Sequence, residues 1–375
     1  MKKLTEMKGF KKWGKAAAAI LTATMLMGLT AGCGEKKAAG TPGTETAETG
    51  AKESNGGESE AEGSTVADTV ADTGEEKTIY VIVKVLGNQY WSVLQAGAEK
   101  AGEDLGCKVV VVGTALESDI EGQLTLLQNA VSAQADGIVI APLDSVSLDK
   151  PITEAHNSFI PVVLVDTVIN SDNYSAALLT NNVAAGKAAA EELLGRMREA
   201  GISEDEESQV AIQVGSTGSQ TIIDRVKGFN EYWDANAPKA WTVLNEDIKV
   251  NEGDISKAVG FCQDFLTTYP NLKAVFGPNN GSTVGFVTGL TEAQRNDIIM
   301  VGFDFSAEIE TMIRSGEYNV ASVVQRQYFM GYDGVKTALE LANGGSVAEK
   351  NIDTGVVLVD SDNVDSEEVQ GIINP

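Results

Sequence analysis

Short, almost entirely apolar runs alternate with helical patterns along most of the chain after residue 77. TIYVIVKV at 78–85, GIVIAP at 137–142 and IPVVLVD at 160–166 are examples, and such runs are typical of strands buried on both faces of a sheet. Segments with helical periodicity, near 90–105, 118–134 and 145–158, lie between the first strands. This alternation predicts parallel sheets with right-handed crossovers, and hence an α/β fold.

A second series of the same kind follows the first. It predicts further strands at 175–180, 209–214, 241–246, 272–277, 298–304, 320–325 and 354–360. Two sheets of this size exceed one doubly wound domain. We therefore expect two similar doubly wound parallel-sheet lobes.

Residues 1–33 have the pattern of a lipoprotein signal peptide. Six lysines lie within residues 1–15, and the apolar stretch 16–30 is short for a membrane span. LTAGCG at 29–34 resembles a bacterial lipobox, in which Cys33 becomes the lipidated first residue, although Leu29 stands one position earlier than in the commonest form. Two acyl chains on Cys33 would anchor the protein to the membrane stably. The alternative is an ordinary secretory signal with an incidental cysteine.

Residues 34–76 consist mainly of Gly, Ser, Thr, Ala and Glu, with almost no large apolar side chain. Such a segment cannot bury enough surface to offset its chain entropy. We expect a disordered acidic tether that lets the folded part stand off from the membrane.

The composition excludes several function classes. The net charge of −26 repels phosphate backbones, so we expect no nucleic-acid partner. His156 is the single histidine, which removes Ser–His–Asp and Cys–His catalytic sites. Cys107 and Cys262 are interpreted as small core residues that form no bridge.

Polar and aromatic residues follow the predicted strands. Ligands of open parallel sheets bind at the carboxyl ends of the strands. The residues found there have neither metal-ligand spacing nor a nucleophile–base pair, so we expect a binding protein without a cofactor or metal, not an enzyme. They are Lys84, Asn88, Tyr90, Trp91, Pro142, Asp166, Asn279, Asn280, Asp304 and Gln325.

Several motifs, in order over residues 77–360, carry a family resemblance. VKVLGNQYW, IAPLDSVSL, LLTNNVAAGKAAA, DRVKGF, LKAVFGPNN, MVGFD and VASVVQ resemble the type I periplasmic binding proteins for pentoses and hexoses. The first two are most similar to the allose-binding type.

The resemblance implies two lobes joined by three crossing strands, with the sugar between them. The N-terminal lobe would comprise 77–180 with 327–354 and the C-terminal lobe 181–326 with 355–375, with the hinge near 180, 326 and 354. It also implies a monomeric, extracytoplasmic protein that closes on a monosaccharide or polyol and delivers it to an ABC transporter permease. The membrane contact would be the lipid anchor alone.

The family's ligand-contacting positions can be matched residue by residue. Two departures stand out, because Thr167 replaces an Arg of the ribose type and Gly253 replaces an aromatic that precedes Asp254. The sequence therefore does not predict a second aromatic that would complete a two-sided sandwich around the sugar. The matched positions are Lys84, Asn88, Tyr90, Trp91, Asp166, Arg225, Asn279, Asp304 and Gln325.

These residue types suit a sugar ring. Tyr90 and Trp91 can stack on its C–H face, although either could instead be a helix core residue. Asp166 and Asp304 can each accept from two hydroxyls, although helix N-capping also fits their positions. Lys84 and Arg225 would donate bonds and balance these acids, while the amides of Asn279 and Gln325 both donate and accept. Asn280 is expected to cap the next helix.

Other functions are less well supported by the sequence. The loop 215–219 (GSTGS) lacks the Lys-Ser/Thr ending of a phosphate-binding loop. A glycosidase-like carboxylate pair from Asp166 and Asp304 is unnecessary, since hydroxyl binding explains both residues. A sensor domain that presents a sugar, or a furanose signal of the autoinducer-2 type, to a signalling membrane protein remains the alternative.

Overall fold

The computed structural model describes residues 76–375, which fall within one compact unit, Val70–Pro375. The expected signal peptide, Cys33 and the tether lie outside the described residues, apart from the last residue of the tether, Glu76. Between 76 and 375, no helix is both long and apolar enough to cross a membrane.

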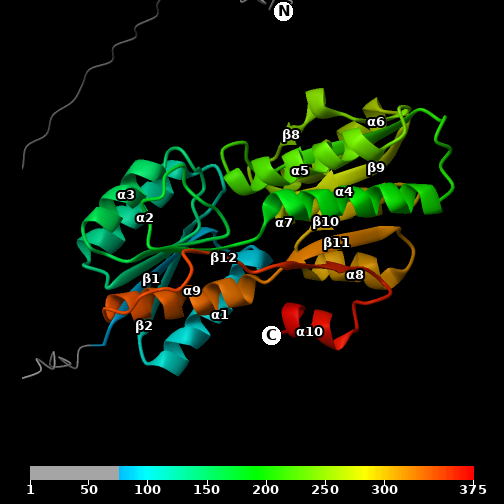
Figure 1. The fold of residues 1–375 in the computed structure, drawn as a ribbon. Helices are drawn as coiled ribbons and strands as arrows, with labels where there is room; N and C mark the ends of the chain where they lie inside the picture. Colours follow the sequence, from blue (N-terminus) through cyan, green and yellow to red (C-terminus); the bar gives the residue numbers. More distant parts are fainter. Residues whose placement is uncertain (1–75) are drawn as a thin grey trace, which may run out of the picture. The chain divides into compact units, whose positions relative to one another are not determined.

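The first sheet has six parallel strands in the order β12-β5-β4-β3-β1-β2. Its apolar side chains alternate between two cores because successive residues of a strand point to opposite faces. Helices α1 and α9 cover one face, and α2 and α3 cover the other (Figure 1). The bounds are β1 (Thr78–Val85), α1 (Gln89–Leu105), β2 (Lys108–Thr114), α2 (Ile120–Ser132), β3 (Gly137–Ile140), α3 (Asp149–Asn157), β4 (Val162–Val165), β5 (Ala176–Leu179), α9 (Gln327–Ala342) and β12 (Asn351–Asp353).

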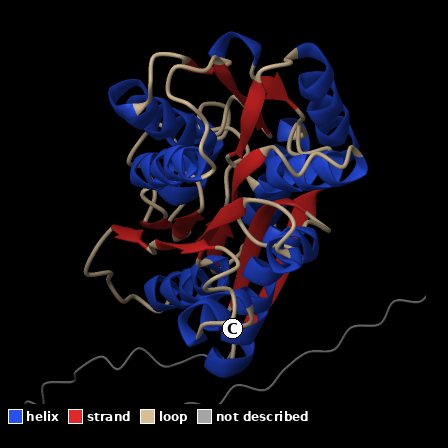
Figure 2. Ribbon diagram, turned by 90° about the vertical axis from the view of Figure 1, so that its right-hand side faces the viewer, coloured by secondary structure: helices blue, strands red, loops and turns tan. Residues whose placement is uncertain are grey.

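The second sheet follows the order β13-β11-β10-β9-β6-β7, with β8 beside β6 and with β13 antiparallel to β11. Helices α4 and α5 pack on one face, and α6, α7, α8 and α10 pack on the other. Figure 2 shows strands with helices on both sides. The bounds are α4 (Asn182–Glu199), β6 (Ser208–Val214), α5 (Gln220–Asn236), β7 (Trp241–Val243), β8 (Lys249–Val250), α6 (Ile255–Thr268), β9 (Leu272–Gly277), α7 (Asn280–Glu292), β10 (Ile299–Phe303), α8 (Ala307–Ser315), β11 (Val320–Gln325), β13 (Val356–Val359) and α10 (Glu367–Ile373). The chain thus forms the two doubly wound lobes expected from its sequence.

The chain passes between the two sheets three times, after β5, after β11 and between β12 and β13. The first lobe is here the first sheet with its helices, and the second lobe is the second sheet with its helices. We retain 77–180 with 327–354 and 181–326 with 355–375 as the proposed limits of these lobes.

Four short elements, β8, β12, α10 and the 3-10 helix η1 (Asn245–Asp247), are not predicted by the sequence pattern. The strand expected at 241–246 ends at Val243, and η1 follows it. β12 is the sequence NID with two exposed polar ends, and β8 is two residues long. Neither β8 nor β12 contains an apolar run, so the hydrophobic pattern of the sequence does not predict them. The helix expected at 145–158 begins only at Asp149, after a series of turns.

Both lobes contain helix pairs in close contact at glycines. A Cβ atom on Gly97 of α1 would lie 2.0 Å from the backbone oxygen of Tyr328 in α9, and one on Gly331 would lie 2.0 Å from that of Leu94. In the second lobe, a Cβ on Gly186 of α4 would lie 2.1 Å from the oxygen of Arg225 in α5. Only glycine permits backbones to approach so closely.

This packing can be tested with two glycines of the same helix. Gly186→Ala should lower the free energy of unfolding by about 1–3 kcal/mol, because backbone must move to admit the methyl group. Gly195 of α4 has no atom within 4 Å of an added Cβ, so Gly195→Ala should leave stability unchanged or raise it by up to about 1 kcal/mol. Urea unfolding measures both; equal stability of the two variants would contradict the packing argument.

Candidate ligand-binding site

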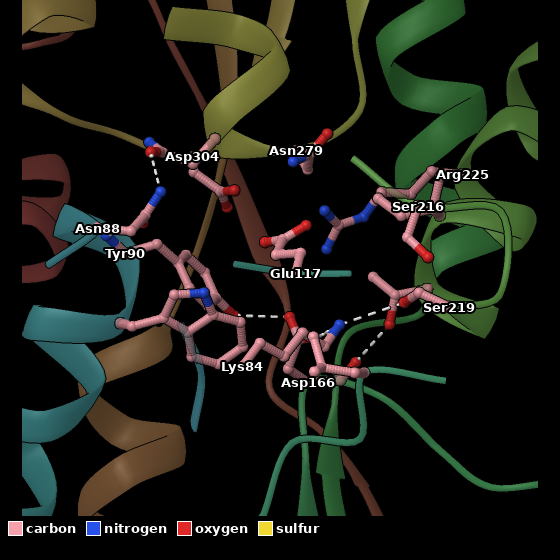
Figure 3. Close-up of a pocket in the computed structure, with 15 residues that line it drawn as sticks. Lys84, Asn88, Tyr90, Glu117, Asp166, Ser216, Ser219, Arg225, Asn279 and Asp304 are labelled. Carbon is pink, nitrogen blue, oxygen red and sulfur yellow. Dashed lines mark hydrogen bonds and ion pairs between the residues drawn. The ribbon is translucent and has the colours of Figure 1, made fainter. Parts of the chain in front are cut away.

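A cavity lies between the two lobes (Figure 3). Its volume is about 30 Å³ when only positions open to the centre of a water molecule are counted, and about 440 Å³ when all space between the atoms, including open solvent, is counted. It is bounded by the residues that follow the strands and by the first turns of α1 and α5. The first lobe contributes Lys84, Asn88, Tyr90, Trp91, Glu117, Leu143 and Asp166, and the second contributes Ser216, Ser219, Thr221, Ile222, Arg225, Asn279, Asn280 and Asp304.

A buried ion pair joins Lys84 to Asp166 on the floor of the first lobe. The Lys84 Nζ lies 2.8 Å from Asp166 Oδ2 and donates to Thr167 Oγ1 at 2.7 Å. The Tyr90 hydroxyl donates to the other carboxylate oxygen of Asp166 at 2.9 Å. Burial would raise the pKa of Asp166, but Lys84 and Arg225 outweigh it and hold that pKa below its ordinary value. Asp166 is therefore a charged acceptor at neutral pH.

Both strand-end aspartates have left-handed backbone conformations. The φ angle is 62° at Asp166 and 72° at Asp304, a region that non-glycine residues occupy at some energetic cost. Neither aspartate is the N-cap of the next helix along the chain: Asp166 leads into a loop, and Ser306 occupies the N-cap position of α8. The Asp304 carboxylate accepts instead from the backbone N–H of Asn280, the first residue of α7. The interpretation of these aspartates as N-caps of the following helix is wrong, because no helix begins directly after either residue.

The two neighbouring aromatic residues of α1 serve the core and the cavity together. Tyr90 and Trp91 contact each other edge to face, with ring centroids 4.7 Å apart, and both are nearly fully buried. Both also line the cavity. The Tyr90 hydroxyl is committed to Asp166, and its burial raises its pKa. Trp91 is therefore the residue of this pair better placed to offer an apolar face to a ligand.

Arg225 is held in place on three sides. Its Nε donates to Asn182 Oδ1 at 2.9 Å, its Nη1 donates to the Pro278 oxygen at 2.8 Å, and its guanidinium lies 4.1 Å from the centre of the Phe303 ring. Its Nη2 is buried and has no hydrogen-bond partner among the described residues. A buried donor without a partner is costly, which favours a ligand oxygen at this position.

Asp304 and Gln325 have different roles. Asp304 lines the cavity, whereas Gln325 lies behind it, is 1% exposed and does not line the cavity. The Gln325 Nε2 donates to Asp304 Oδ1 at 2.8 Å. Burial raises the pKa of Asp304 to about 6, although Arg225 and the bond from Gln325 oppose this rise.

The two asparagines at the start of α7 differ from expectation in one respect. Asn279 occupies the N-cap position, where Asn280 was expected, and Asn280 is the first helical residue. The Asn279 Oδ1 accepts from the Gly215 N–H at 3.1 Å, which holds the loop 215–219 at the cavity. Asn280 Oδ1 accepts from Asn88 of the other lobe at 3.0 Å.

Several lining residues were missed. Glu117 follows β2, so the rule that ligand-binding residues follow the strands also covers it. Burial, with Asp166 and Asp304 nearby, raises the pKa of Glu117, while Lys84 and a bond from Trp91 lower it. The other lining residues that the sequence analysis does not name as site residues fall into two groups. Leu143 follows β3, and Ser216 and Ser219 follow β6, so the strand-end rule covers them. Thr221 and Ile222 belong to the first turn of α5 and have no distinctive sequence signal.

Hydrogen bonds join the lobes around the cavity. Lys84 Nζ donates to Ser219 Oγ at 3.2 Å, and the Thr221 hydroxyl donates to the main-chain carbonyl oxygen of Asp166 at 2.7 Å. Further out, the Ser145 N–H donates to the Gly218 oxygen at 3.1 Å and Gln89 Oε1 accepts from the Ala307 N–H at 2.9 Å. The lobes are thus closed around the cavity.

The charges at the cavity are unequal. Three carboxylates (Glu117, Asp166 and Asp304) face two cations (Lys84 and Arg225). No group of three or more His, Cys, Asp or Glu side chains in residues 76–375 is arranged to hold a metal ion. The arrangement suits a ligand with many hydroxyl groups, which can donate to the carboxylates and accept from Arg225.

Comparison with known proteins gives a consistent result. The sequence profile described as a periplasmic binding protein domain matches residues 79–346. The D-allose-binding periplasmic protein of Escherichia coli K12 is 27% identical over 289 residues, which is 75% of this chain and 89% of that protein. The ribose import binding protein of the same organism is 26% identical over 280 residues, 75% of this chain and 90% of that protein.

Solved structures resemble this one over their whole length. A carbohydrate transporter solute-binding protein from Agrobacterium radiobacter, in complex with D-arabinose, superposes with a TM-score of 0.75 and 32% identity over 80% of this chain and 100% of that chain. An ABC transporter solute-binding protein from Agrobacterium vitis, with bound D-fucose, gives a TM-score of 0.72 and 31% identity over 79% and 99%.

The raised pKa of Asp304 predicts a stabilising substitution. Its carboxyl group retains a proton in the folded protein between pH 4 and about 6, so its contribution to stability falls as the pH rises through that range. Above pH 6, Asp304→Asn should raise the free energy of unfolding by on the order of 2–3 kcal/mol.

The gain should disappear near pH 4, where both forms are neutral. Thermal melts of both proteins at pH 4 and pH 8 test this. A gain that is the same at both pH values would show that burial of charge is not its cause.

Proposed function

Since this chain belongs to the type I periplasmic sugar-binding family, whose members bind solutes without converting them, we propose that it captures one monosaccharide, a hexose or a pentose, in the cavity between its lobes. We propose further that it delivers this sugar to an ABC transporter permease. A relative named as an ABC transporter solute-binding protein with bound D-fucose supports both steps, and a relative named as a D-allose-binding periplasmic protein supports the first.

One observation carries the proposal. An aromatic side chain, an unpartnered guanidinium nitrogen and carboxylates from both lobes face the same small cavity. Trp91 would cover the apolar C–H face of a sugar ring. Asp166, Asp304 and Arg225 would bond its hydroxyls, as would Lys84, Asn88, Asn279 and Glu117 where they reach the ring.

Ligand binding would act through closure of the lobes. A sugar that bonds Asp166 of the first lobe and Asp304 of the second contacts both lobes only in the closed state. It therefore shifts the equilibrium towards that state by its differential contacts. Closure also brings together Asn88 and Asn280, which belong to different lobes, so the permease would meet a surface that exists only in the closed form.

A thermal-shift screen tests the proposed ligand class. A neutral pentose or hexose at about 100 times its Kd should stabilise the protein by about 2.7 kcal/mol, which raises the melting temperature by several degrees. Because the cavity carries more carboxylates than cations, the matching uronic acid should bind at least about 10-fold more weakly. Asp304→Asn, although folded, should show little shift with the neutral sugar.

Two outcomes would refute parts of this proposal. Absence of a shift with any monosaccharide or polyol at millimolar concentration would exclude the ligand class. A uronic acid that binds better than its neutral parent would contradict the assignment of the charges.

The lipobox-like sequence supports a second proposal, that Cys33 is diacylated and anchors the protein, as a monomer, on the extracytoplasmic face of the membrane. When the full-length chain is expressed in a bacterium, it should partition into detergent and incorporate labelled fatty acid. Cys33→Ala should abolish both. An unlabelled wild-type protein secreted in soluble form would instead support the ordinary secretory signal.

A further inference from the structure

A continuous series of buried side-chain hydrogen bonds leads from the hinge to the cavity. The Thr180 hydroxyl donates to Gln325 Oε1 at 2.9 Å, and Gln325 Nε2 donates to Asp304 Oδ1 at 2.8 Å. The exposed fractions are 5% for Thr180, 1% for Gln325 and 3% for Asp304. Water therefore cannot readily replace a missing partner in this series.

The direction of these bonds is dictated by chemistry. An ionised carboxylate can only accept, so the NH₂ group of Gln325 must face Asp304. The amide oxygen of Gln325 must then face Thr180, which has to donate its hydroxyl hydrogen. Loss of the Thr180 hydroxyl would leave the amide oxygen buried beside an apolar group and remove the reason for the amide to keep this orientation.

Thr180 and Gln325 lie where the chain crosses between the lobes. Thr180 follows β5 at the first crossing, and Gln325 ends β11 at the second. The third crossing is bonded to the first at a separate point, where the Thr354 hydroxyl donates to the Leu179 oxygen at 3.0 Å. Thr354 has no bond to Gln325 or Asp304 among those of the described residues. It is therefore a matched control for Thr180.

We propose that Thr180 is a positioning residue for the ligand site: by orienting the Gln325 amide, it holds the Asp304 carboxylate towards the ligand and ties it to the hinge. The proposal deepens the proposed function and rests on it only where Asp304 is taken as a ligand contact. Gln325 would accordingly act on the ligand through Asp304. The contacts at the hinge would then affect the affinity for the sugar through the orientation of this carboxylate.

Other charged and titratable groups also face Asp304. Arg225 approaches from α5, Asp166 from the end of β4 and Tyr90 from α1. Glu117 approaches from the loop after β2, and Lys84 lines the same cavity. None of them bonds to Thr180, so substitution of Thr180 leaves them in place and isolates the effect of the amide.

The decisive experiment needs no ligand. The carboxyl ¹³C resonance of Asp304 is titrated in protein labelled at aspartate, and the resonance is identified by its absence from Asp304→Asn. The wild-type midpoint is expected near the raised pKa of about 6. Thr180→Val should move it about 0.5 to 1 pH unit higher, because the bond that favours the ionised form is lost or weakened. Thr180→Ser, which keeps the hydroxyl, and Thr354→Val should both match the wild type.

A second measurement concerns binding at pH 7.5, with a sugar that the thermal-shift screen identifies. Thr180→Val should raise its Kd by about 10-fold and Thr180→Ser should restore it. If Thr180→Val fails to fold, Gln325→Met can be measured instead. This substitution removes the Gln325 amide that donates to Asp304, and it should also move the titration midpoint of Asp304 to a higher pH.

The outcomes separate the two proposals. If no sugar binds the wild type, the proposed function fails, while the titration still decides the role of Thr180. An Asp304 midpoint that is unchanged in Thr180→Val, or that moves equally in Thr354→Val, overturns the role of Thr180 whatever the sugar does. Weaker binding with an unchanged midpoint overturns it too, since a loosened hinge alone would produce that result.

Discussion

The buried ion pair between Lys84 and Asp166 is the interaction on which the site depends. Two charges removed from water are tolerable only when they are paired and hydrogen-bonded, and here Thr167, Ser219 and Tyr90 complete that bonding. The pair ends in a network that reaches the second lobe through Ser219. The same carboxylate that stabilises the lysine is therefore part of the contact between the lobes.

Asp304 provides a contrast on the other lobe. It has no ion pair of comparable length, and burial raises its pKa where that of Asp166 is lowered. The burial of the Asp304 charge is energetically costly, and both aspartates also have a left-handed backbone. Both residues lie at the cavity and not in the hydrophobic cores. Buried charge on residues with a left-handed backbone is typical of sites that have been selected for binding over stability.

The strand-end rule predicts about half of the residues that line the cavity, but it cannot rank them. Parallel strands present their carboxyl ends at one edge, so the sequence alone indicates Lys84, Asp166 and Asp304. The rule could not say that Gln325 lies behind Asp304, because both end strands of the same sheet. The rule also covers Glu117, which follows β2. The N-cap of α7 is Asn279 and not Asn280, because the helix begins one residue earlier than its sequence pattern indicates.

Sequence alone determined the alternation of apolar runs and helices, and with it two doubly wound lobes, because burial on both faces of a strand requires apolar side chains throughout. The family motifs can likewise be recognised from the sequence alone, because each is a short run of consecutive residues. The tertiary structure decided which strand ends face the same cavity, which carboxylate is paired and which is not, and how Thr180 reaches Asp304. These depend on distances between residues that are separated along the chain, for example by 145 positions for Thr180 and Gln325, and no local pattern encodes such distances.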